Sequence, residues 1–173
     1  DVRDLEHFTA QGADEVEFMI STNPGSIPPR PLGEVASGGE LSRIMLAIKT
    51  VLADTDDIPT LIFDEIDTGI SGRTAQKVSE RLSYIAGKHQ VLCITHLPQI
   101  AAMADTHFEI RKTVENGKTS TRIHKLGKEE QTEELARLLG GAEITGAVLE
   151  NAREMKRLAE KKKRELLKER NVI

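Results

Sequence analysis

The sequence predicts an α/β fold with a mostly parallel sheet flanked by helices. Two short, continuous apolar segments, 60–63 and 90–95, have the pattern of strands that are buried on both faces. Segments with helical apolar periodicity lie between and before them, at 71–86 and 37–53. This alternation of strands and helices indicates a parallel sheet rather than a sandwich of two antiparallel sheets.

The first third of the chain carries weaker signals. Residues 15–21 alternate in polarity, which predicts a half-buried strand with Val16, Phe18 and Ile20 on one face. Prolines at 28, 29 and 31 exclude a helix before Leu32. Because apolar residues cover most of the circumference of the 37–53 helix, we expect that helix to be largely buried.

The last third predicts a hairpin and several helices. The dipeptide Asn116-Gly117 separates two alternating segments, 106–114 and 118–125, and Asn-Gly is a strong signal for a two-residue hairpin turn. Three further helices are predicted, at 98–104, 129–139 and 145–170. In the last of these, Lys162 stands where the apolar spacing calls for an apolar residue.

Composition excludes several classes of protein. Aromatic residues make up only 3% of the 173 residues, which argues against a single-strand nucleic-acid platform built on stacked rings. The single cysteine, Cys93, excludes an intrachain disulfide and indicates a reducing, cytoplasmic location. No apolar run approaches the roughly 20 residues of a membrane helix. The first residue is Asp1, so we expect the chain to be part of a longer protein.

Charge is unevenly distributed along the chain. The last 24 residues, 150–173, carry nine basic and five acidic residues, whereas the overall net charge is −4. The run of basic residues at 161–164 has two interpretations: it contacts DNA phosphates, or it is the solvated face of a packed helix. We favour the second.

Two glycines occupy the predicted first turn of the 37–53 helix. Ser37 and Glu40 form an S-x-x-E capping box, which accounts for these two residues. The box does not account for Gly38 and Gly39, each of which costs a helix about 1 kcal/mol relative to alanine. Glycines at this place let an anion approach the exposed backbone N–H groups at the start of the helix.

Charged and titratable residues follow both predicted strands. Asp64 and Glu65 come directly after the 60–63 strand, and His96 comes directly after the 90–95 strand. Ligands of α/β sheets bind at the carboxyl ends of the strands, where Asp64 could hold Mg²⁺ and Glu65 could activate a water. His96 at the same edge could contact a terminal phosphate. The alternatives are two solvated loop acids and a surface histidine.

In this order and spacing, the motifs resemble the second half of an ATP-binding-cassette (ABC) ATPase. The 37–40 segment resembles the signature motif, 61–65 the Walker B motif, 67–72 the D-loop, and His96 the switch histidine. Each motif is weak alone, whereas the ordered set is specific.

Finer details resemble the chromosome-maintenance and DNA-repair (SMC-like) branch of that superfamily. Glu40 replaces the glutamine of membrane-transport cassettes, and Ile66-Asp67 replaces their Pro-Thr. A transport-type cassette and a non-catalytic interaction module are the alternatives, and the intact Glu65 and His96 argue against the second. Ser71 departs from the Asp that a D-loop usually has.

The resemblance implies that this chain is the C-terminal lobe of an ABC-type ATPase head that hydrolyses ATP with Mg²⁺. It also implies a cytoplasmic, nucleoid-associated protein that acts in double-strand-break repair and recombination. Two heads would enclose two ATP molecules, with DNA as a further partner and no membrane. By resemblance, Asp64 serves the metal, Glu65 activates the attacking water and His96 senses the γ-phosphate. The implied nucleotide-binding residues are Ser37, Gly38, Gly39, Glu40, Asp67 and Ser71.

The phosphate-binding P-loop of such a head has no counterpart in this sequence. Gly117-Lys118-Thr119 matches only the tail of the motif, and it lies in the predicted hairpin rather than between a strand and a helix. The resemblance therefore implies an N-terminal, P-loop-bearing half as partner, without which this chain is expected to be inactive. We expect 1–144 to be the head portion and 145–173 to be a basic helix packed on it or extending from it.

Overall fold

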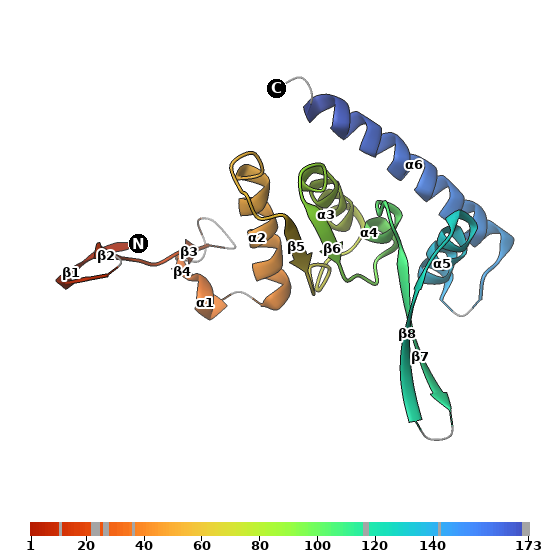
Figure 1. Cartoon of the computed structure of the whole chain (residues 1–173), viewed down its shortest axis with the longest axis horizontal. Coiled ribbons are helices and arrows are strands. Elements are labelled where there is room, and N and C mark those ends of the chain that lie inside the picture. Colours follow the sequence, from red (N-terminus) through yellow and green to blue (C-terminus); the bar gives the residue numbers. More distant parts are fainter. Residues whose placement is uncertain are drawn as a thin grey trace.

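A computed structural model describes residues 1–10, 12–21, 25, 28–35, 37–115, 118–141 and 143–170. In Figure 1, small antiparallel pairs lie at the N-terminal end, a parallel strand pair lies between helices in the middle, and helices gather at the C-terminal end.

The centre of the fold is a parallel pair of strands. Strand β5 (Thr60–Phe63) pairs with β6 (Gln90–Cys93), in the register that places Phe63 opposite Cys93. Helices α2 (Gly38–Val51) and α3 (Gly72–Ile85) pack against each other beside this pair. Both strands and both helices were predicted, and the parallel pairing confirms the α/β class.

The first hydrophobic core lies between these strands and helices. Its buried residues come mainly from α2, α3, β5 and the loop after β5, and Ile66 and Ile85 are completely buried. Leucine, isoleucine and phenylalanine side chains of this size stabilise a fold by about 1.5–3 kcal/mol each when fully buried. This core fixes where β5 ends and therefore where the 64–68 loop begins.

The second core is built by the last three helices. They are α4 (Pro98–Ala102), α5 (Lys128–Gly140) and α6 (Gly146–Arg170). Small residues let the helices approach closely, because Ala136, Ala152 and Ala159 are buried at their contacts. The polar break at Lys162 is tolerated because its amine pairs with Glu165 at 3.7 Å on the same helix.

A long hairpin leaves the body between these helices (Figure 1). Strand β7 (Phe108–Glu115) pairs antiparallel with β8 (Lys118–Lys125), and Glu115 lies opposite Lys118. The two strands confirm the predicted hairpin, while its turn residues, Asn116 and Gly117, lie outside the described residues. Lys118 and Thr119 open β8, so they are not part of a P-loop.

The N-terminal region differs from the prediction. It contains β1 (Val2–Thr9), β2 (Gly12–Val16), β3 (Met19–Ile20), β4 (Arg30–Pro31) and α1 (Leu32–Val35). The single strand predicted at 15–21 is wrong, because β2 pairs with β1 whereas β3 pairs with β4. The change of partner breaks the strand, and Val16 and Phe18 are 62% and 71% exposed. The sequence Asn23-Pro24-Gly25 is typical of a turn, but residues 23 and 24 lie outside the described residues.

The expectation that α2 is largely buried is also wrong for this chain. Only Gly39 and Leu46 of the helix are buried. An apolar stripe along one side is 40–49% exposed, namely Leu41, Met45, Ile48 and Leu52. The reason is that α2 packs on α3 and on the 64–68 loop with its other side only. In the part of the chain that is described, no helix combines the length and apolarity needed to cross a bilayer.

Candidate nucleotide site

The ends of β5 and β6 bring the predicted carboxylates and the predicted histidine to one edge of the sheet. Because the strands are parallel and in register, Asp64 and Glu65 leave β5 at the edge where His96 follows β6. All three residues are exposed. The backbone of Glu65 has φ +57°, a left-handed conformation that non-glycine residues adopt rarely and at a cost of about 1–3 kcal/mol.

The 37–40 turn forms the predicted capping box at the start of α2. The Ser37 amide donates to Glu40 Oε2 at 2.9 Å, and the Glu40 amide donates to Ser37 Oγ at 3.4 Å. The hydrogen bonds from the Ser37 backbone and side chain hold the pKa of Glu40 below its usual value. Glu40 therefore stays ionised, and its structural role as a cap is accounted for.

The two glycines of this turn lie directly against Glu65. A Cβ atom on Gly38 would stand 2.5 Å from Glu65 Oε2, and one on Gly39 would stand 2.8 Å from the Glu65 carbonyl oxygen. Real Cβ atoms do not approach other atoms so closely. A larger residue at Gly39 would push the turn and the loop apart, whereas one at Gly38 would displace the Glu65 side chain. The glycines thus permit a close approach within this chain, a reason that the sequence alone did not reveal.

Asp67 connects the 64–68 loop to the segment after β6. Its Oδ2 accepts hydrogen bonds from Thr95 Oγ1 at 2.6 Å and from the His96 amide at 2.9 Å, and His96 Nδ1 lies 3.0 Å away. Burial acts to raise the pKa of this carboxyl, which is 4% exposed. The hydrogen bonds and the charge of His96 outweigh burial and lower the pKa. Asp67 is thus a buried, ionised group that positions His96.

Sequence reasoning missed two side chains that join α2 to the loop, Ser42 and Arg43. Both reach backbone carbonyls of the 64–68 loop. The available signal was helical spacing, because Arg43 lies one turn after Gly39 and on the same face of α2. Ser71, predicted to bind nucleotide, is the exposed N-cap of α3, and its side chain makes no capping hydrogen bond.

Cys93 packs beside the first core, at the end of β6. Burial, together with the charges of Asp67 and Asp64, raises the pKa of its thiol to about 12. A thiol with so high a pKa is almost entirely protonated near neutral pH and is therefore a poor nucleophile. Cys93 is a packing residue rather than a reactive one.

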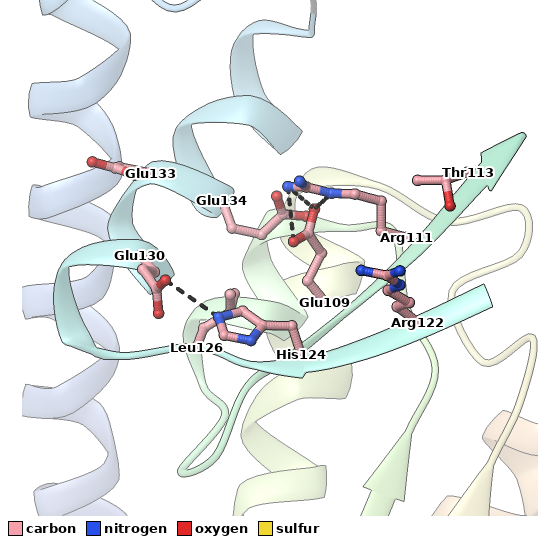
Figure 2. Close-up of a pocket in the computed structure, with 9 residues that line it drawn as sticks. All are labelled: Glu109, Arg111, Thr113, Arg122, His124, Leu126, Glu130, Glu133 and Glu134. Carbon is pink, nitrogen blue, oxygen red and sulfur yellow. Dashed lines mark hydrogen bonds and ion pairs between the residues drawn. The ribbon is translucent and has the colours of Figure 1, made fainter. Parts of the chain in front are cut away.

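A separate pocket of about 510 Å³ lies between the hairpin and α5 (Figure 2). Charged residues line most of it and are largely paired with one another: Arg111 with Glu109 at 2.9 Å, and His124 with Glu130 at 3.3 Å. No residue predicted to bind nucleotide lines this pocket. The predicted site is instead the open edge formed by the 37–40 turn, the 64–68 loop and His96.

Comparisons with known proteins extend over most of the chain. DNA repair protein RecN of Halalkalibacterium halodurans is 51% identical over 152 residues, 88% of this chain and 27% of that protein. RecN of Bacillus subtilis is 49% identical over 155 residues, and RecN of Haemophilus influenzae is 49% identical over 152. They cover 90% and 88% of this chain, respectively, and 27% of each relative. No protein-family model matches the chain.

Among solved structures, one similar chain comes from a study of ATP-driven dimerization and DNA-stimulated activation of SMC ATPases. It is 23% identical with a TM-score of 0.45, and the match covers 70% of this chain and 79% of that one. This chain spans about a quarter of the length of the curated relatives. The resemblance predicted from the motifs is nevertheless confirmed: along 88% of its length the chain matches the C-terminal part of DNA repair protein RecN.

Proposed function

We propose that this chain is the C-terminal portion of an ATPase head that acts in DNA double-strand-break repair, within a RecN-like protein. The observation that carries the proposal is the contact of Gly38 and Gly39 with Glu65, at the edge where His96 also lies. The similarity to proteins named for DNA repair supports it. In this proposal 1–144 is the head portion, and 145–173 is a C-terminal helix packed on it through Ala152 and Ala159.

The exposed groups at this edge fit ATP with Mg²⁺. Among the described residues, no group of three or more His, Cys, Asp or Glu side chains could hold a metal ion. Mg²⁺ commonly binds one or two carboxylates together with substrate phosphates, so Asp64 suffices as the protein ligand. The metal would neutralise developing charge on the phosphates. Ser37, Gly38 and Gly39 would hold the phosphates of a nucleotide bound to the opposite head, at the positive end of α2.

The remaining residues would act on the water and on the phosphate. Glu65 would accept a proton from the attacking water, and His96, held by Asp67, would contact the γ-phosphate. The rare backbone conformation of Glu65 supports a functional role, since strain of this kind persists where the surrounding structure imposes it. We assign Asp67 and Ser71 supporting roles around the nucleotide.

Exposed apolar surface beside the site supports a second, P-loop-bearing portion. The stripe on α2 contains Leu41 and Met45, and on the open face of the sheet Ile62 and Ile94 are 69% and 54% exposed. Contiguous apolar surface of this kind marks a contact with another protein segment. We propose that the N-terminal portion of the same protein covers it. "Complete ATPase" hereafter means this chain combined with that portion.

Dimerisation of the complete ATPase tests the proposal. When Glu65→Gln slows hydrolysis, ATP should convert the complete ATPase from a monomer to a dimer of heads. The reason is that the 37–40 turn of one head binds the nucleotide held by the other head. Ser37→Arg should abolish this conversion, and Thr119→Arg, on the exposed β8 strand, should not. Light scattering with and without ATP reports the mass. Dimerisation that is independent of ATP, or that survives Ser37→Arg, would contradict the proposed site.

The basic run at 161–164 is expected to contribute little to DNA binding. Lys163 pairs with Asp105 at 2.6 Å and Lys162 with Glu165, so the two central lysines are already engaged by carboxylates. Replacing all four basic residues by glutamine should leave the affinity of the complete ATPase for duplex DNA within about twofold. Fluorescence anisotropy over a salt series measures this. The slope of log affinity against log salt concentration reports the number of phosphate contacts. A slope that corresponds to two or more fewer contacts in the variant would reverse our interpretation.

A further inference from the structure

The start of α2 is tied to the 64–68 loop by two side chains. Ser42 Oγ donates to the Asp64 carbonyl oxygen at 2.8 Å. Arg43 Nη1 donates to the Ile66 carbonyl oxygen at 3.1 Å and to the Thr68 carbonyl oxygen at 2.9 Å. Three successive bonds from one helical turn thus reach a loop that lies more than 20 residues away in sequence.

The arginine contact lies in a closely packed place. A Cβ on Gly39 would meet the Glu65 carbonyl oxygen, Thr68 Cβ and Arg43 Nη1 within 3.1 Å, so helix, loop and guanidinium are packed without spare room. The bond to the Ile66 carbonyl oxygen is partly buried, so that carbonyl is costly to leave without its donor. The guanidinium offers several donors in one rigid plane, which suits two carbonyls at once better than an amine does.

These contacts continue to the other side of the site. The same loop carries Asp67, which binds the Thr95 hydroxyl and the His96 amide. The 37–40 turn, Glu65 and His96 are therefore joined within one chain through Arg43 and the loop. In the proposed dimer, the 37–40 turn serves the nucleotide of the opposite head, whereas Glu65 and His96 serve the nucleotide of their own head.

We propose that Arg43 is a positioning residue that couples the two nucleotide sites through one chain, by holding the Glu65 loop against the turn that contacts the other nucleotide. The inference rests on the proposed function and adds a residue to it. In this proposal Arg43 contacts neither the nucleotide nor the attacking water. It acts through the backbone of Ile66 and Thr68, and so through the place of Glu65.

Kinetics of the complete ATPase give the first test. Arg43→Ala should lower kcat by about tenfold or more, because small displacements of a catalytic group cost rates of this order, with KM for ATP within about twofold. The Hill coefficient for ATP should fall toward one. Arg81→Ala, at an exposed position on α3, is the matched control and should change neither quantity. A kcat within about twofold of wild type would overturn the inference.

Hydrogen exchange gives a readout that is independent of activity. The Thr68 amide donates to the Glu65 carbonyl oxygen at 3.0 Å, inside the loop that Arg43 holds. In the complete ATPase without nucleotide, Arg43→Ala should speed exchange at this amide, while the amides of α6 exchange as before. If Arg43→Ala does not fold, Arg43→Lys should give a smaller effect of the same kind, because the lysine amine keeps the charge and the donors but does not have the rigid plane of the guanidinium. Unchanged exchange at Thr68 in a folded variant would overturn the inference.

A double variant separates this inference from the proposed function. If Arg43 acts through Glu65, then adding Arg43→Ala to Glu65→Gln should reduce the residual turnover by less than about twofold. If Arg43→Ala lowers turnover by the same factor in Glu65→Gln as in wild type, Arg43 does not act through Glu65. That result would overturn this inference but not the proposed function. Wild-type turnover in Glu65→Gln by itself would instead remove the proposed role of Glu65, whatever Arg43 does.

Discussion

Replacing Glu65 with glutamine is expected to lower kcat of the complete ATPase by about 10²- to 10⁴-fold, the usual contribution of a general base. Glutamine keeps the size of the side chain and its place against Gly38, where Glu65 Oε2 already limits the available space. The negative charge and the ability to accept a proton are lost. Steady-state ATP turnover at saturating ATP measures the effect.

The control for this change is Glu129→Gln, at an exposed position in the first turn of α5. It removes the same charge far from the sheet edge and should leave kcat unchanged. Binding of ATP, measured with a fluorescent analogue, should persist in Glu65→Gln because Glu65 is not a phosphate ligand. Near-normal turnover in Glu65→Gln would remove the assignment of Glu65 as the base.

Replacing Asp67 with alanine is expected to destabilise this chain by about 3 kcal/mol, because two hydrogen bonds to a buried charged group are lost and each contributes about 1.5–3 kcal/mol. Asp67 is 4% exposed and accepts bonds from the Thr95 hydroxyl and from the His96 amide, so its loss leaves two partly buried donors unpaired. Urea denaturation gives the free energy of unfolding. Asp57→Ala, at an exposed loop position, is the control. A loss below about 1 kcal/mol, no larger than a typical single hydrogen bond, would contradict the buried, charged role of Asp67.

The contribution of the Asp67 charge should also depend on pH in a definite direction. Its pKa is lowered in the folded chain from the ordinary value of 3.8, so the unfolded chain binds the proton more tightly. The stabilisation is therefore complete above about pH 5 and is lost as the pH falls through 3.8 toward the folded value. The difference in unfolding free energy between wild type and Asp67→Asn should shrink over that range. If this difference in unfolding free energy instead grows as the pH falls, the lowered pKa of Asp67 would be contradicted.

The central part of the fold could be predicted because its signals are local. Continuous apolar segments mark β5 and β6, the Ser37 and Glu40 pair marks the start of α2, and the alternating segments around 116–117 mark the hairpin. The N-terminal strands could not be predicted in the same way. The alternation at 15–21 does not show which segments these residues pair with. It therefore does not reveal that β2 pairs with β1 whereas β3 pairs with β4.

The position of the proposed site residues at one edge could be predicted, whereas the contacts among them could not. Parallel strands bring Asp64, Glu65 and His96 to one edge, which follows from topology alone. That Gly39 packs against a backbone carbonyl, or that Asp67 is buried beneath His96, depends on the three-dimensional path of the loop. The apolar composition of α2 led to the prediction that it is buried, but one side of the helix is exposed in this chain.

The measurement that tests the account most directly is ATP hydrolysis by complementary portions. This chain alone, the P-loop-bearing portion alone and their equimolar mixture are assayed under the same conditions, with a P-loop lysine variant as the control for the mixture. We expect negligible turnover by either portion alone, and turnover in the mixture that disappears with Glu65→Gln. Robust hydrolysis by this chain alone, or a mixture that binds together yet hydrolyses no ATP, would contradict it.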